Sequence, residues 1–339
     1  MFRNSWLVAV CLSVLSALFL ARGASAQSAA GIDASGYDYY LTGNAGDVVR
    51  TTTPGLVLAG GGTDVDEAML WLLQRSGGGD IMIIRTSGSD GYNQYLYDMA
   101  PVDSVESFVF KTRTAATKQS MYDKLMTADA LFIAGGDQYD YIRKWQGTLV
   151  EQAIHDLLAR GVPIGGTSAG LAILGDVIYS AANGSAYSDE ALANPYNRYM
   201  TFEPNFLDIP LLANLITDTH FAERDRMGRL VAFVARLMQD GLSSQARGLG
   251  VSEQTAVLVE PNGSARVVGV GNAYFLTAPG MPERCVARKT LTYLNVPVYR
   301  LSAGPGAFNF NTWTGTGGLA YTLTAQNGIL TASKPGGPY

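Results

Sequence analysis

Short apolar runs alternate with amphipathic segments over the first half of the chain. Each run is apolar almost throughout, as in strands that are buried on both faces. The runs span residues 55–59, 81–84, 107–110, 130–134 and 161–164. Between them apolar residues recur at helical spacing, so helices are expected after a cap at Asp64, over 115–126 and from 138 to 160. This alternation predicts a mostly parallel sheet covered by helices, with the active site beyond the carboxyl ends of its strands.

The remaining segments differ in composition from this alternating region. Residues 27–50 are small and polar, which predicts a flexible lead-in. Residues 302–339 are rich in Gly, Thr and Asn, which predicts a loosely packed tail. Several short apolar runs between 248 and 301 predict a β-rich part. One α/β domain is therefore expected over residues 51–301.

The N-terminus has the three parts of a secretory signal. Arg3 supplies a positive charge, residues 6–20 form an apolar run, and Ala24-Ser25-Ala26 is a small-residue cleavage site. A membrane anchor is the alternative, but the run is short and ends at Arg22. The sequence thus predicts that residues 1–26 are a signal peptide and that the mature chain is exported to the periplasm or the medium, without membrane contact.

Charge and ligand-type residues exclude several classes of function. The 339 residues carry a formal net charge of −5 and only 16% are charged, which argues against a nucleic-acid partner. Two histidines and one cysteine beyond the signal, Cys285, give no metal-ligand spacing, so no metal or other cofactor is expected. The glycines at 60–62 match neither the dinucleotide fingerprint nor the P-loop, which needs a lysine.

The segment Gly166-Thr167-Ser168-Ala169-Gly170 reads G-x-S-x-G between an expected strand and an expected helix. A serine at this place sits on a sharp turn with its hydroxyl exposed, and it is a candidate nucleophile. Gly-rich turns of this kind also arise for packing alone. If Ser168 attacks a carbonyl, the backbone N–H groups of Ala169 and of Gly136 or Asp137 are the expected oxyanion donors.

A serine nucleophile needs a base, and the chain offers only two histidines. His155 falls within an expected helix, where a partly exposed polar residue is the ordinary reading, so His220 is the base by elimination. Glu253 is the candidate to orient His220, although it could equally be a solvated residue of a hairpin turn. Asp218 is an alternative, but its place two residues before His220 favours substrate binding.

Three arginines follow His220, at positions 224, 226 and 229. At this spacing they do not share one helical stripe, so they converge only if the segment begins in a loop. They are either the solvated face of a helix or a site for carboxylates, which guanidinium groups bind with two hydrogen bonds. The second reading implies an acidic substrate.

Taken in order along the chain, these motifs resemble the cyanophycinase branch of the S51 serine peptidases. The matching pieces are Leu58 to Gly62, Phe132 to Gln138, Gly165 to Gly170, Asp218 to Phe221 with Arg224 to Leu230, and Gly248 to Glu253. The resemblance implies a three-layer α/β fold of the flavodoxin or class I glutamine-amidotransferase type, often dimeric. It also implies a triad of Ser168, His220 and Glu253. The substrate pocket that it implies is lined by Gln138, Asp218, Arg224, Arg226 and Arg229.

The same resemblance implies hydrolysis of cyanophycin, multi-L-arginyl-poly-L-aspartate, to β-Asp-Arg dipeptides by an exopeptidase. The alternatives are a peptidase for other Asp-containing peptides, similar to the aspartyl dipeptidases, and a non-catalytic binding protein on the same fold. Two residues depart from the family pattern, since Thr219 stands where Gln is common and Ser252 where Asp is common. The signal favours degradation of polymer outside the cell.

Overall fold

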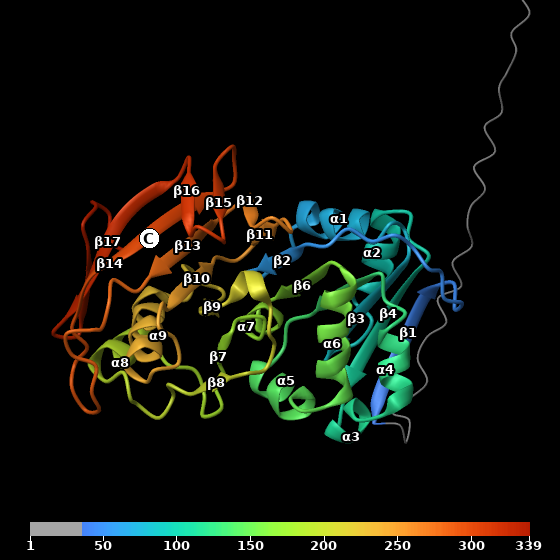
Figure 1. The fold of residues 1–339 in the computed structure, drawn as a ribbon, viewed down its shortest axis with the longest axis horizontal. Helices are drawn as coiled ribbons and strands as arrows, with labels where there is room; N and C mark the ends of the chain where they lie inside the picture. Colours follow the sequence, from blue (N-terminus) through green and yellow to red (C-terminus); the bar gives the residue numbers. More distant parts are fainter. Residues whose placement is uncertain (1–35) are drawn as a thin grey trace, which may run out of the picture.

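A computed structural model describes residues 36–339 of the chain; the predicted signal peptide lies outside the described residues. Two large sheets dominate it (Figure 1). The larger sheet has ten strands in the order β1-β4-β3-β5-β6-β2-β11-β12-β15-β16, and the smaller has six in the order β18-β17-β14-β13-β10-β9. A short pair, β7 (Val177–Tyr179) and β8 (Phe202–Pro204), forms a third sheet.

The centre of the ten-stranded sheet is parallel. Its strands are β4 (Ser104–Phe110), β3 (Asp80–Arg85), β5 (Ala130–Ile133), β6 (Ile164–Thr167) and β2 (Leu56–Ala59), each paired in parallel with the next. Almost every residue of these strands is buried, which is why the chain is apolar throughout each run. Four of the five predicted strands are confirmed. The fifth, expected at 161–164, begins only at Ile164, because the N–H groups of Gly161 and Val162 still bond to carbonyls of the preceding helix.

Helices cover both faces of this parallel centre. Alternate strand residues such as Ile81 and Phe132 pack with α1 (Asp66–Arg75) and α2 (Asn93–Met99). Their neighbours Met82 and Leu131 face the opposite helices. Those helices are α3 (Arg113–Ala116), α4 (Gln119–Leu125), α5 (Gln138–Trp145) and α6 (Leu149–Arg160). The predicted three-layer, flavodoxin-like α/β fold is therefore confirmed.

Three helix predictions need correction. The single helix expected over 115–126 is divided into α3 and α4, which are separated at Thr117 and Lys118. Asp64 does not cap α1, whose N-cap is Val65 and carries no side-chain hydrogen bond. The single helix expected over 138–160 is broken between α5 and α6, because Gly147 adopts a positive φ of 68° and Thr148 caps α6 by accepting a hydrogen bond from the N–H of Val150.

The predicted β-rich part, 248–301, is confirmed and contributes to both large sheets: β10, β13 and β14 to the six-stranded sheet, and β11 and β12 to the larger one. In the six-stranded sheet, β9 (Leu215–Asp218) and β10 (Arg247–Val251) pair in parallel, and β13 (Asn272–Thr277), β14 (Tyr293–Ser302), β17 (Leu319–Gln326) and β18 (Ile329–Ala332) continue it antiparallel. One face packs against β11 (Thr255–Val259), β12 (Ser264–Gly269) and β15 (Ala307–Asn309) of the larger sheet. The other face packs against α8 (Ser188–Ala193) and α9 (Met227–Gln239).

Both segments expected to be loosely held contain paired strands. Within the described part of the lead-in, β1 (Tyr37–Gly43) pairs antiparallel with β4, and Tyr39 packs on Phe108 with ring centroids 4.9 Å apart. In the expected tail, β17 pairs with β14, and β15 pairs with β16 (Thr314–Thr316). Phe308 stacks on Phe275 at 3.7 Å. The tail prediction is wrong, because aromatic and apolar residues alternate with its small polar ones.

Two further observations concern the described residues as a whole. None of the helices between residues 36 and 339 combines the length and the apolar character that crossing a bilayer requires. Cys285 is buried and its thiol is free.

Candidate active site

Ser168 stands at the end of β6, where the chain turns into the short helix α7 (Ala169–Ala172). Its backbone has φ 53° and ψ −119°, a conformation that costs about 1–3 kcal/mol for a residue with a side chain. The flanking glycines permit this turn: a Cβ at Gly166 would lie 2.5 Å from the carbonyl oxygen of Gly170, and one at Gly170 would overlap the carbonyl oxygen of Ile133. Both glycines of G-x-S-x-G are therefore required by space.

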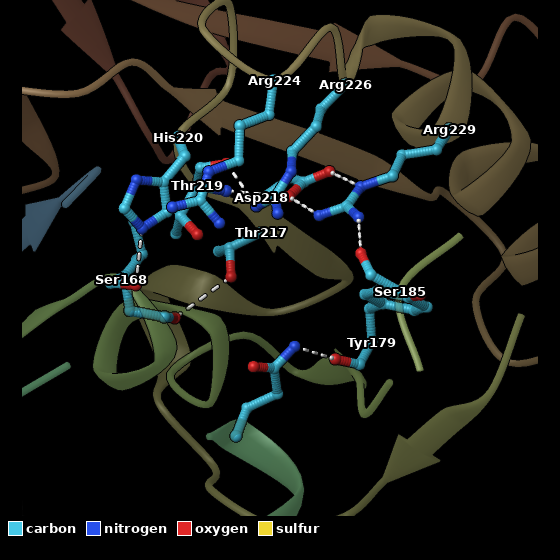
Figure 2. A network of polar contacts seen from close by, with 12 residues as sticks. Ser168, Tyr179, Ser185, Thr217, Asp218, Thr219, His220, Arg224, Arg226 and Arg229 are labelled. Atoms are coloured by element: carbon cyan, nitrogen blue, oxygen red, sulfur yellow. Dashed lines mark hydrogen bonds and ion pairs between the residues drawn. The ribbon is translucent and has the colours of Figure 1, made fainter. Parts of the chain in front are cut away.

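His220 reaches Ser168 from the other sheet, from the turn that follows β9. Its Nε2 lies 2.7 Å from Ser168 Oγ, and its Nδ1 lies 2.6 Å from Oε1 of Glu253 (Figure 2 shows the first contact). The carboxylate favours the tautomer that carries hydrogen on Nδ1, which leaves Nε2 to accept the hydrogen bond from the serine. The structure thus joins the three predicted side chains in one hydrogen-bonded chain.

Burial lowers the pKa of His220 below its ordinary value of 6.5, and the positive charges of Arg224 and Arg226 act in the same direction. The hydrogen bond to Glu253 opposes this shift without reversing it. At neutral pH the imidazole is therefore neutral and able to accept a proton, as a general base must be.

Glu253 lies on the link between β10 of the smaller sheet and β11 of the larger one. Its backbone N–H donates to Oε2 of Glu223 at 3.0 Å, and the N–H of Gln254 donates to the carbonyl of Gly61 at 2.9 Å. Its carboxylate also lies 3.9 Å from Nε of the half-exposed Arg224. These contacts hold the carboxylate beside His220, so it is not the freely solvated turn residue that was the alternative.

The glycine loop 60–62 packs directly on these residues. The carbonyl of Gly60 accepts the N–H of His220 at 2.8 Å. A Cβ on Gly61 would lie 2.5 Å from His220 Cε1 and 3.1 Å from Ser168 Cβ, and one on Gly62 would lie 3.1 Å from Glu253 Cβ. Sequence reasoning missed this loop because it tested only phosphate-binding patterns. The available signal was its position directly after a buried parallel strand.

The loop after β5 supplies the other side of the serine. A Cβ on Gly135 would lie 3.5 Å from Ser168 Cβ. The hydroxyl of Tyr141 fills the space beside Gly136 and donates to the carbonyls of Ala134 and Gly135 at 2.7 and 3.0 Å. Asp137 is the N-cap of α5 and accepts the N–H of Tyr139. Oxyanion binding by Gly136, Asp137 and Ala169 stays a prediction.

Asp218 and Arg229 bind each other rather than facing a ligand. Arg229 donates to both carboxylate oxygens of Asp218, at 2.7 and 2.6 Å, and also to Ser185 Oγ and the carbonyl of Ala186 (Figure 2). The two residues are 2% and 3% exposed. Because this pair is buried and each member binds the other, the structure does not favour direct substrate contact by either residue.

Arg224 and Arg226 precede α9, which begins at Met227, so the segment does start in a turn as the convergence of the arginines required. Arg226 donates to the carbonyl of Thr219 at 2.7 Å and lies 3.5 Å from Asp218 Oδ1. Burial lowers the pKa of Arg226 to about 10, with the charge of Asp218 opposing the shift. The guanidinium of Arg226 therefore keeps its charge at neutral pH.

The remaining residues singled out in the sequence make the following contacts. Gln138 donates from Nε2 to the carbonyl of Tyr179 at 3.4 Å. Thr219 is buried, with its N–H on Asp218. Ser252 is buried, and within the described structure its hydroxyl has no hydrogen-bond partner. His155 lies 3.3 Å from the carbonyl of Phe206, beside residues at the amino end of β2, away from Ser168.

This arrangement supplies a nucleophile, a neutral base, a carboxylate that orients the base, and two cationic groups. Such a set can transfer an acyl group from an acidic substrate to water. Over residues 36–339, His, Cys, Asp and Glu side chains nowhere gather in threes as metal ligands would.

Known peptidases resemble this chain in sequence. Residues 106–267 match the model of peptidase family S51. The cyanophycinase of Synechococcus elongatus is 26% identical over 230 residues, which cover 64% of this chain and 66% of that protein. The cyanophycinase of Trichormus variabilis is 25% identical over 215 residues, 62% of this chain and 66% of that one. The chain thus spans just under two thirds of the length of these curated relatives.

A solved structure shares the fold. The crystal structure of a peptidase from an acI-B1 Actinobacterium superposes with a TM-score of 0.50 at 16% identity, covering 76% of this chain and 98% of that one. The fold of a known peptidase therefore extends over most of the described residues.

Proposed function

We propose that this chain, whose residues 106–267 match peptidase family S51, is a serine peptidase that hydrolyses cyanophycin to β-Asp-Arg dipeptides, with Ser168 as the nucleophile. The observation that carries the proposal is the continuous contact from Ser168 Oγ through His220 to Glu253, at 2.7 and 2.6 Å. The cyanophycinases among the relatives supply the substrate class.

The geometry supports a two-step acyl transfer. Ser168 Oγ attacks the scissile carbonyl while His220 Nε2 takes its proton, and Glu253 stabilises the imidazolium that forms. The N–H of Ala169, with that of Gly136 or Asp137, stabilises the oxyanion. Collapse of the tetrahedral intermediate passes the proton from His220 to the departing amine and leaves an acyl-enzyme. Water, deprotonated by the same histidine, then releases the acid and restores Ser168.

Arg226 and Arg224 indicate that the substrate carries a negative charge. Arg226 is oriented by the carbonyl of Thr219 and by Asp218, and Arg224 is half exposed beside His220. A guanidinium group pairs with a carboxylate through two parallel hydrogen bonds. We assign the carboxylates of the aspartyl backbone or of its arginyl groups to this pair, with Gln138 at the edge of the pocket and the Asp218–Arg229 pair supporting it.

We further propose that the enzyme is exported as the N-terminal pattern predicts, acts on polymer in the periplasm or the medium, and is a homodimer. A second candidate substrate is a short Asp-containing peptide. The arginine pair favours this candidate as well, because it recognises carboxylates and does not require the arginyl side groups of cyanophycin.

Incubation with purified cyanophycin, followed by mass identification of the products, tests the proposal. We expect β-Asp-Arg from the polymer, faster than cleavage of short Asp-Xaa peptides, and no release by Ser168→Ala with an unchanged far-UV spectrum. Activity on short peptides alone would select the second candidate. Turnover retained by Ser168→Ala would refute the mechanism, and acidic-peptide binding without reaction of Ser168 with a serine-directed phosphonate would indicate a binding protein.

A further inference from the structure

Helix α9 begins without a local cap. Its N-cap residue is Arg226, whose side chain makes no capping hydrogen bond because it points to Thr219 and Asp218. The first N–H groups of a helix have no partner within the helix, and Ser, Thr, Asp or Asn at the N-cap usually supplies one. Here a candidate ligand for substrate occupies the cap position, so the cap must come from elsewhere.

Ser188 Oγ accepts the N–H of Arg229 at 3.2 Å, and Tyr339, 112 positions along the chain from Met227, supplies the partner of the first N–H. The Tyr339 hydroxyl accepts the N–H of Met227 at 2.9 Å and donates to Oδ1 of Asp225 at 2.8 Å. These are the two residues that flank Arg226. Asp225 has a φ of 48°, so it needs a partner that holds its left-handed backbone, and Ser188 also donates to its carbonyl.

The ring of Tyr339 also contacts the start of the turn 221–226, next to His220. It meets Phe221 edge-on with centroids 6.0 Å apart, and Phe221 directly follows His220. It also meets Tyr274 of β13 edge-on at 5.9 Å. Burial raises the pKa of the Tyr339 hydroxyl, and the hydrogen bond to Asp225 adds to the shift, so the group stays protonated as this donor role requires.

The residues around Tyr339 are themselves held. Tyr321 of β17 donates to the carbonyl of Pro338 at 2.5 Å, and Lys334 donates to the carbonyl of Gly337 at 2.6 Å. The segment 334–339, which follows β18 of the smaller sheet, is therefore joined to the turn 221–226 through Tyr339.

We propose that Tyr339 is a positioning residue for substrate binding: it fixes the turn 221–226 so that the guanidinium of Arg226 is held at the pocket. This inference rests on the proposed function, in which Arg226 binds a substrate carboxylate. It adds a residue that touches neither the substrate nor Ser168 and that acts through the backbone on both sides of Arg226.

The test is Tyr339→Phe, with Tyr293→Phe as the matched control, because the Tyr293 hydroxyl makes one hydrogen bond, to the carbonyl of Gly280 and not to the turn 221–226. We expect Tyr339→Phe to lower kcat/KM for the polymer about tenfold, mainly through KM, and to speed hydrogen exchange of peptides covering 221–229. The control leaves both quantities unchanged. Asp225→Asn, which weakens the same bond, should lower kcat/KM in the same direction but less.

A double-mutant cycle separates positioning from general destabilisation. If Tyr339 acts through Arg226, Tyr339→Phe costs less than twofold in an Arg226→Ala background. An unchanged kcat/KM in Tyr339→Phe, or the same tenfold loss in both backgrounds, would overturn the inference. Inactivity of the unmodified enzyme on all aspartyl substrates would refute the proposed function instead, while unaltered exchange over 221–229 in Tyr339→Phe would by itself overturn the positioning role.

Discussion

Replacing Gly61 by alanine tests whether the glycine loop is part of the catalytic geometry. Gly61 has a φ of 98°, and a Cβ there would lie 2.5 Å from His220 Cε1 and 2.6 Å from Nε2. Ordinary van der Waals contact begins at 3.4 Å, so the imidazole must move by about 1 Å, away from the new methyl group. The atom forced to move is the nitrogen that contacts Ser168.

Two costs follow, and they can be separated. The left-handed backbone costs about 1–2 kcal/mol of stability for an alanine wherever it occurs. A displacement of about 1 Å at a catalytic group costs about a hundredfold in rate, which is about 2.7 kcal/mol of transition-state stabilisation. Gly241 provides the matched control, because it has a φ of 70° and an added Cβ would have nothing within 4 Å.

The assay compares Gly61→Ala and Gly241→Ala in urea unfolding and in steady-state hydrolysis. We expect both to lose stability through the left-handed backbone, Gly61→Ala more so because of the overlap with His220, but only Gly61→Ala to lose about a hundredfold in kcat/KM. Full activity in Gly61→Ala, or an equal loss of activity in Gly241→Ala, would refute the assignment of His220 as a base held by this loop.

Two further predictions concern charge. Arg229→Ala leaves the Asp218 carboxylate buried without its partner and should lower the free energy of unfolding in urea by about 3–5 kcal/mol. Arg143→Ala, whose exposed side chain pairs with Asp140, should lower it by about 0.5 kcal/mol, and a loss below 1 kcal/mol in Arg229→Ala would contradict the structural role of the Asp218–Arg229 pair. Because the pKa of His220 is lowered, kcat/KM should rise with pH through a midpoint below 6.5, and Arg224→Gln, which removes one of the causes, should move that midpoint upward; a downward move would contradict this account.

The parallel core could be predicted because its strands are buried on both faces, which makes each an uninterrupted apolar run. The strand at Tyr37–Gly43 could not be found in this way, since it is an edge strand whose tyrosines and leucine are only partly buried and whose buried residues are Asp38 and Thr42. In Leu319–Gln326 the buried residues Tyr321, Leu323 and Ala325 alternate with less buried ones, and the Gly- and Thr-rich composition around them concealed this period of two.

In the candidate site, too, residues with a signal in the nearby sequence could be predicted, and contacts between distant residues could not. Ser168 could be predicted from its own flanking glycines, and His220 from the scarcity of histidine. The pairing of Asp218 with Arg229 could not, because a guanidinium group that binds a substrate and one that binds a buried carboxylate have the same sequence signature. The contact of Tyr339 with Met227 leaves no local signal at all, since the two lie 112 positions apart.

The division of the three proposed catalytic residues between two sheets has a consequence for folding. Ser168 belongs to the larger sheet and His220 to the smaller, and Glu253 lies where the chain crosses from one to the other. The strand β11 that follows this crossing pairs with β2, about two hundred positions earlier in the chain. Contacts of such long range form late. In refolding, secondary structure should therefore return before hydrolytic activity, and a chain with only its N-terminal half folded would carry a serine without its base.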